Sequence, residues 1–127
     1  MNNKIQLVLK IIVALILVQT LRYKFTAHPD SVYIFSKLGL EPYGRIGIGI
    51  LELITSVLLF IPKTVWVGAL LALGVISGAL FSHLTKLGIE INDDGGKVFY
   101  MAVIVFVLSA IILLNNRKSI PFIGKTL

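Results

Sequence analysis

The stretch 47–60, GIGILELITSVLLF, holds a single carboxylate among apolar and small residues. A charged side chain at the centre of a bilayer costs about 3 kcal/mol on insertion scales, so such residues usually face a protein interior and have partners there. Glu52 shares a helical stripe with Arg45, Gly49 and Ser56, at spacings of seven, three and four residues from it. These spacings place all four on one face of a helix, which predicts that Glu52 points inward.

Basic and amide side chains at the ends of the neighbouring apolar segments are the partners expected for Glu52. Lys10 lies inside the first segment, from which it either reaches the near membrane interface or turns inward. An ion pair would lock the helices together, whereas a buried carboxylate with such neighbours is also suited to bind a ligand or carry a proton. The residues predicted to form a buried polar network or ligand site are Glu52, Lys10, Lys24, Arg22, Gln19 and His83.

Small residues are predicted to let helices approach closely. Gly74, Gly78 and Ser82 repeat every four residues, which is the small-xxx-small pattern of membrane helices in close contact. With Gly49, they are interpreted first as packing positions inside the molecule. The alternative is a homodimer seam, so a homo-oligomer stays open.

The composition places these residues in a membrane protein. The 127 residues are 57% hydrophobic and 14% charged, with a mean hydropathy of +0.94. About a quarter of the residues in a soluble domain are charged. The net charge of +6 comes from basic residues at the edges of apolar segments, which suits lipid headgroups rather than nucleic acid.

Several kinds of chemistry are excluded or disfavoured. The chain has no cysteine, which excludes disulfides and thiolate metal sites, so a redox role would need a bound cofactor or a partner subunit. His28 and His83 have no carboxylate at ligand spacing, and no metal site is expected. No nucleophile–base set or phosphate-binding loop is found, so the catalytic residues, if any, are unknown.

The elements that would position the polar residues are helices. Four apolar segments, 4–24, 43–61, 64–85 and 96–115, each approach the ~20 residues that cross a bilayer as a helix. In the long first connection, Pro29 and Gly39 suit the start and end of a short amphipathic helix over 29–38. The prediction is one all-α integral membrane domain over 1–127, a bundle of four transmembrane helices.

The connections add two further expectations. Pro62 and Lys63 form a tight turn, so the second and third segments are antiparallel neighbours. Asp93 or Asp94 is expected to cap the start of the fourth segment. Four crossings place both termini on one side, and the distribution of charges favours the cytoplasmic side.

With these features in order, the chain resembles the DoxX-like family of small four-helix bacterial membrane proteins. The resemblance rests on Leu9-Lys-Ile-Ile12, Tyr23-Lys-Phe25, the glutamate motif in 50–59 and the segment 77–88 that ends in a histidine and a glycine. It covers nearly the whole chain. Lys10 stands where the family usually has an arginine, so bidentate pairing of a guanidinium with Glu52 is not available.

The resemblance implies a location in the bacterial cytoplasmic (inner) membrane. It also implies an accessory or quinone-interacting subunit of a membrane oxidoreductase system, with quinone as the candidate cofactor and a redox enzyme as the partner. Such a subunit would not be catalytic alone. Fold follows from such a resemblance more firmly than chemistry does.

Two other functions remain open at this level. In a non-catalytic scaffold or assembly factor, Glu52 and its basic partners would set the register of the helices. In a small proton-coupled transporter, Glu52 would carry the proton. Small multidrug-resistance exporters have a similar length and one membrane glutamate, but theirs is in the first helix, where this chain has Lys10.

Overall fold

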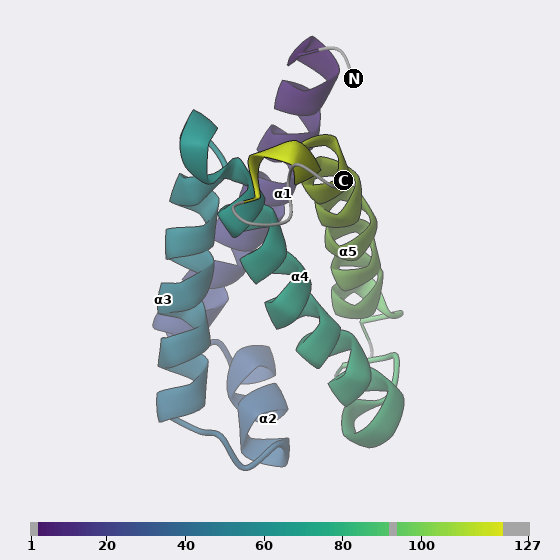
Figure 1. Ribbon diagram of the computed structural model, residues 1–127. Coiled ribbons are helices and arrows are strands. Elements are labelled where there is room, and N and C mark those ends of the chain that lie inside the picture. Colours follow the sequence, from purple (N-terminus) through teal and green to yellow (C-terminus); the bar gives the residue numbers. More distant parts are fainter. Residues whose placement is uncertain (1–2, 92–93, 121–127) are drawn as a thin grey trace.

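The computed structural model describes residues 3–91 and 94–120, and in this part of the chain all regular secondary structure is helical, with no strand. The all-helical prediction is therefore confirmed. The elements, shown in Figure 1, are α1 (Asn3–Phe25), α2 (Pro29–Lys37), α3 (Tyr43–Leu58), the 3₁₀ turn η1 (Pro62–Thr64), α4 (Val65–Ser82), the π-helical turn η2 (His83–Leu87), α5 (Lys97–Asn115) and the 3₁₀ turn η3 (Arg117–Ser119).

The four long helices form a ring around an apolar core. α1 packs against α3 and α5, and α4 packs against the same two helices from the other side (Figure 1). The start of α1 and the end of α5 lie at the same end of the bundle, where the Asn116 side chain donates a hydrogen bond to Gln6. The core between the helices consists of Val13, Leu17, Leu59, Val65, Ala69, Ile76, Ala102, Val105 and Ile112.

Among the described residues, three helical segments are long and apolar enough to cross a membrane: Asn3–Phe25, Pro62–Leu87 and Lys97–Asn115. Large apolar side chains also cover their outer faces, with Leu15 65% and Leu114 62% exposed. The helix that carries Glu52 is shorter than these. α3 has 16 residues, and its predicted continuation to 61 is wrong. Pro62 disfavours helical geometry at the preceding residue, and Ile61 is extended.

α3 and α4 meet closely at their connection because of a glycine that the sequence analysis did not single out. A Cβ at Gly68 would lie 3.0 Å from the backbone nitrogen of Leu59 and 3.2 Å from the carbonyl carbon of Leu58. Gly74 and Gly78 are exposed, and a Cβ at either would meet nothing within 4 Å. Their predicted role in close packing inside the molecule is therefore wrong.

α2 closes the end of the bundle opposite the start of α1 and the end of α5. Pro29 occupies its first turn, and His28 Nδ1 accepts a hydrogen bond of 3.1 Å from the backbone of Asp30. Gly39 follows the helix with φ +74°, a left-handed conformation that favours glycine, so the predicted start and stop of this helix are confirmed. α2 packs against α1, α3 and η2, which places it across the bundle mouth (Figure 1).

Asp94 organises the connection into α5, as predicted, whereas Asp93 lies outside the described residues. Its carboxylate accepts hydrogen bonds from the backbone nitrogens of Ile91, Gly96 and Val98, at 3.1, 2.7 and 3.2 Å. Desolvation raises the pKa of Asp94, but the backbone hydrogen bonds outweigh it and hold the pKa below its ordinary value. The start of α5 is therefore fixed by an ionised carboxylate.

Candidate functional site

Glu52 lies on the inward face of α3, as its spacing predicts. The buried residues of this helix are Arg45, Gly49, Glu52, Thr55 and Ser56. Thr55 and Ser56 return their hydroxyls to the helix, donating to the carbonyls of Leu51 and Glu52. Both hydroxyls therefore form hydrogen bonds within α3, and the partners of the Glu52 carboxylate come from another helix.

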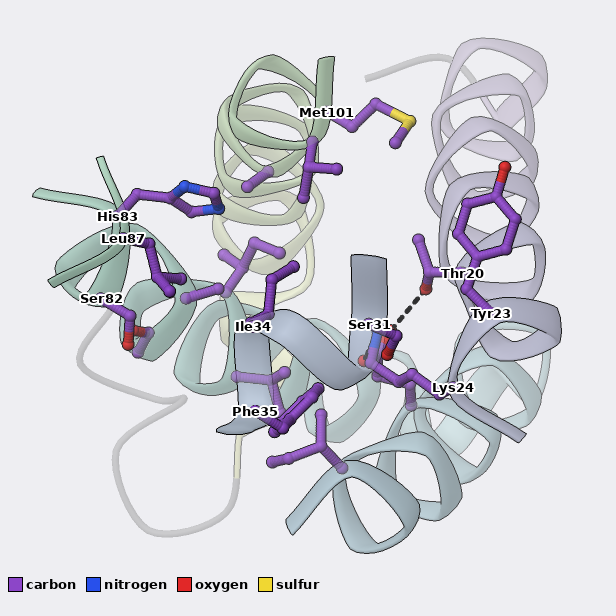
Figure 2. A pocket seen from close by; sticks show the side chains of 18 of the residues that line it. Thr20, Tyr23, Lys24, Ser31, Ile34, Phe35, Ser82, His83, Leu87 and Met101 are labelled. Atoms are coloured by element: carbon purple, nitrogen blue, oxygen red, sulfur yellow. Dashed lines mark hydrogen bonds and ion pairs between the residues drawn. The ribbon is translucent and has the colours of Figure 1, made fainter. Parts of the chain in front are cut away.

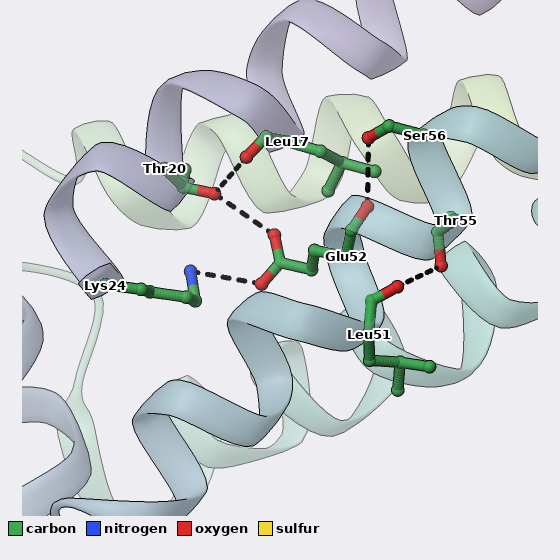
Figure 3. A network of polar contacts seen from close by, with 7 residues as sticks. All are labelled: Leu17, Thr20, Lys24, Leu51, Glu52, Thr55 and Ser56. Carbon is green, nitrogen blue, oxygen red and sulfur yellow. Dashed lines mark hydrogen bonds and ion pairs between the residues drawn. The ribbon is translucent and has the colours of Figure 1, made fainter.

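Those partners come from the last turns of α1 (Figure 3). Lys24 Nζ lies 3.1 Å from Glu52 Oε1, and the Thr20 hydroxyl lies 3.1 Å from Glu52 Oε2. The hydroxyl of Thr20 is also 2.8 Å from the carbonyl of Leu17. A hydroxyl has one proton to donate, so Thr20 can donate to an ionised Glu52, or accept from a protonated Glu52 while it donates to Leu17.

A second ion pair supports the first. Arg45 Nε lies 2.7 Å from Glu41 Oε1, and Arg45 also donates to the backbone carbonyl of Lys24. The end of α1 that carries Lys24 is thereby held against the start of α3. Gly49 permits this contact, since a Cβ there would lie 2.8 Å from the ring of Phe25. The packing role predicted for Gly49 agrees with this geometry.

Three of the predicted partners do not reach Glu52. Among the described residues, Lys10, Gln19 and Arg22 make no hydrogen bond or ion pair with it. Lys10 precedes Thr20 by ten residues, about 15 Å along a helix at ~1.5 Å per residue, so it lies far from the carboxylate. Arg22 is exposed and stacks over the ring of Tyr23 at 5.7 Å instead.

His83, the first residue of η2 after α4, approaches the same space without contacting Glu52. It is 3% exposed, its Nδ1 lies 2.8 Å from the carbonyl of Gly88, and Phe99 packs edge-on to its ring. A carbonyl only accepts, so Nδ1 carries the proton and Nε2 has a lone pair in the neutral ring. Within the described chain no group hydrogen-bonds to Nε2, and Figure 2 shows the ring pointing into a cavity.

The cavity has a volume of about 310 Å³ and lies between the four long helices beneath α2 (Figure 2). Most of its lining is apolar, including Ile34 and Phe35 of α2 and Met101 of α5. Thr20 and Lys24 lie on one wall, and His83 lies on another (Figure 2). Glu52 also lines the cavity and is bound to Thr20 and Lys24, so it shares their wall. A mainly apolar cavity of ~300–1,000 Å³ with a few converging polar groups is the usual form of a small-molecule site.

The arrangement suits a small, mainly apolar molecule with hydrogen-bonding groups at separate positions. Lys24 offers N–H donors, Glu52 offers an acceptor or a proton, and Nε2 of His83 offers an acceptor. In the part of the chain that the structure describes, no three histidine or acidic residues lie close enough together to hold a metal ion.

The chain has no match among protein-family models, curated proteins or solved structures. The site is therefore read from its own geometry.

One member of the site, Thr20, was missed by the sequence analysis. The buried residues Val13, Leu17 and Leu21 mark the inward stripe of α1, and Thr20 and Lys24 continue it. That stripe was the signal that could have found Thr20. It could also have favoured Lys24 over Arg22, because Arg22 lies away from the stripe.

Proposed function

We propose that this chain is a multi-pass protein of the bacterial cytoplasmic membrane that binds a quinone head group, as an accessory subunit of a membrane oxidoreductase system. One observation carries the proposal: an apolar cavity of about 310 Å³ with the Lys24–Glu52 pair on one wall and His83 on another. The resemblance to DoxX-like proteins agrees with this function. In the proposed membrane arrangement α3 is a fourth, shorter crossing.

The polar groups match the two redox states of a quinone. A quinone carbonyl needs a donor, which Lys24 supplies, and a quinol hydroxyl needs an acceptor, which Nε2 of His83 or Glu52 supplies. Reduction of a quinone to a quinol consumes two electrons and two protons. Glu52 and His83 are the groups that would exchange those protons. The electrons would come from the partner oxidoreductase, since this chain has no cysteine to hold a thiol-based redox centre.

Thermal unfolding of the purified protein tests the proposal. A ligand that binds only the folded state at 100 times its dissociation constant stabilises it by about 2.7 kcal/mol. We expect decylubiquinone to raise the unfolding temperature of the wild type and of Lys10→Met, and to do so much less for Glu52→Gln. Equal protection of all three proteins, or no protection of the wild type at millimolar quinone, would contradict the proposal.

The ion pair itself supports a second function. The Lys24–Glu52 ion pair and the hydrogen bond from Arg45 to the backbone carbonyl of Lys24 join α1 to α3 at one end of the bundle, which is the arrangement of a scaffold whose polar groups set helix register. In that case Glu52→Gln would lower stability and assembly with the partner enzyme, while quinone would protect neither protein. The same unfolding series separates the two functions.

A further inference from the structure

We propose that the cavity opens sideways between α3 and α4, past Leu40 and Gly78, and that a hydrocarbon tail of the bound ligand lies in this opening. This inference rests on the proposed quinone site and adds to it the ligand class: a head group with a long apolar chain that enters from the lipid.

The exposure of the lining residues locates the opening. Of the cavity's lining residues, Leu40 and Gly78 are exposed, and all the others are buried or half-buried. Leu40 precedes α3 and is 49% exposed, whereas Gly78 lies on α4. Figure 1 shows α3 and α4 diverging from their connection at η1, with α2 between their far ends. The exposed part of the lining, which is the rim of the cavity, therefore runs from Leu40 in the α2–α3 connection to Gly78 on α4.

On the α4 side of the rim, Gly78 has no side chain to obstruct the opening. A Cβ at this position would meet nothing within 4 Å, so no neighbouring side chain fills the space. Val75, three residues before Gly78 on α4, also lines the cavity and is half-buried, as is Ile48 of α3. The rim thus presents apolar side chains and a bare backbone, a surface suited to an alkyl or prenyl chain rather than to a charged group.

The cavity's volume requires a way out for a tailed ligand. About 310 Å³ is the space of about ten water molecules at ~30 Å³ each, and so of about ten non-hydrogen atoms. A substituted benzoquinone ring reaches that size before any tail is added. A tail of ten or more carbons must therefore leave the cavity.

The opening lies at a depth where the tail would meet lipid. Gly78 is three to four residues from the middle of the candidate span Pro62–Leu87, which is about 5 Å at ~1.5 Å per residue. The hydrocarbon core of a bilayer is ~30 Å thick, so this side of the rim faces hydrocarbon in the proposed orientation.

The test compares binding of decylubiquinone and of its tail-less parent benzoquinone to protein in lipid nanodiscs. The variant is Gly78→Leu, which places a side chain on the rim. Gly74→Leu is the matched control, because Gly74 is one turn away, exposed and equally open, but does not line the cavity. Both substitutions replace glycine with a better helix former, so neither should impair folding.

We expect Gly78→Leu to bind decylubiquinone at least tenfold more weakly than the wild type, and Gly74→Leu to bind it as the wild type does. The tail-less benzoquinone should bind all three proteins equally. Equal binding of decylubiquinone to all three, or equal loss in both variants, would overturn the sideways opening and leave the quinone site standing. No binding of either quinone to the wild type would overturn both.

Discussion

Glu52 belongs to an ion pair and to a cavity wall at once. Its side chain is 6% exposed, and that of its partner Lys24 is 15% exposed. Lys24 and Thr20 hold the carboxylate in place, while its position on the cavity wall keeps it within reach of a bound molecule. The position of Glu52 is therefore compatible both with a structural ion pair and with ligand binding, and experiments are needed to distinguish the two roles.

A double-mutant cycle measures how much the Lys24–Glu52 ion pair stabilises the folded protein. Glu52→Gln leaves the Lys24 ammonium without its counter-ion, and we expect the free energy of unfolding to fall by about 2 kcal/mol. This is less than the ~3–5 kcal/mol lost when a fully buried pair is broken, because Lys24 retains some access to solvent. Lys24→Met combined with Glu52→Gln should cost less than the sum of the single changes.

Lys10→Met is the control for this cycle. Lys10 is half-buried on α1 and pairs with no described residue, so its removal should change the free energy of unfolding by no more than ~0.5 kcal/mol. A larger loss in Lys10→Met than in Lys24→Met would show that the wrong lysine has been assigned to Glu52.

Asp94 gives a prediction of pH dependence. Its pKa is lower in the folded state than in the unfolded chain, so its stabilisation is complete above about pH 4, the ordinary pKa range of aspartate, and is lost as pH falls through the lower folded value. Asp94→Asn should cost about 1 kcal/mol at pH 7. The measurement is the difference in free energy of unfolding between wild type and variant from pH 7 to pH 2. A difference that stays constant over this range would contradict the assignment.

The sequence predicted the burial of single residues correctly where the periodicity of one helix was enough to determine it. The stripe through Arg45, Gly49 and Glu52 is buried as predicted. Which basic residue pairs with Glu52 depends on how far α1 and α3 slide along each other. The periodicity of one helix contains no information on that offset, so Lys10 and Lys24 remained equivalent until the packing was known.

At the scale of elements, the contact between α3 and α4 depends on one glycine. Gly68 is buried against the backbone of Leu58 and Leu59, whereas Gly74 and Gly78 of the same helix face open space. A repeat of small residues indicates where another helix could approach closely, but not which of these positions a neighbouring helix contacts. The closest approach is instead set by the short connection η1, which brings the first turns of α4 beside the last turn of α3.

Paired alanine substitutions test this packing. Gly68→Ala places a Cβ about 3 Å from backbone atoms, which cannot rotate away, and should destabilise the protein by about 1–3 kcal/mol. Gly47→Ala on α3 meets nothing within 4 Å and should stabilise the protein by about 0.5–1 kcal/mol, because alanine is the better helix former. The check is the free energy of unfolding in mixed micelles. A change in the free energy of unfolding of the same sign in both variants would contradict the close approach of α3 and α4 at Gly68.

Local signals predicted the bounds of α2, whereas the end of α4 has no such signal. Pro29 and Gly39 mark the limits of α2, and Pro62 begins η1 directly after the extended residue Ile61. At the end of α4 the helix widens into the π-helical turn His83–Leu87, and Gly88, with φ +76°, ends it. A π-turn depends on tertiary contacts such as that of His83 with Phe99, which local propensity does not contain.

At the scale of the whole molecule, the two ends of the bundle differ. The end that holds the start of α1 and the end of α5 is closed around Gln6 and Asn116, whereas the other end holds α2, the ion pairs and the cavity. If α3 crosses the membrane together with the three longer spans, the turn at Lys63 lies on the same side as the start of the chain.

Single cysteines test that arrangement, since the chain has none of its own. Lys4→Cys and Lys63→Cys should react with a membrane-impermeant maleimide from one side, which we expect to be cytoplasmic. Lys37→Cys and Glu90→Cys should react from the other side. With only three crossings, position 63 would instead react together with position 37, and that result would rule out the four-helix membrane bundle.

Photolabelling with an azido-quinone tests whether the cavity beside Glu52 binds a quinone. Labelled protein in nanodiscs would be digested, and the modified peptides mapped. We predict label in the cavity-lining parts of the chain, around Thr20, Glu52 and His83, which excess decylubiquinone removes. Label confined to the outer apolar faces of α1, α4 and α5, or unaffected by excess decylubiquinone, would contradict quinone binding in this cavity.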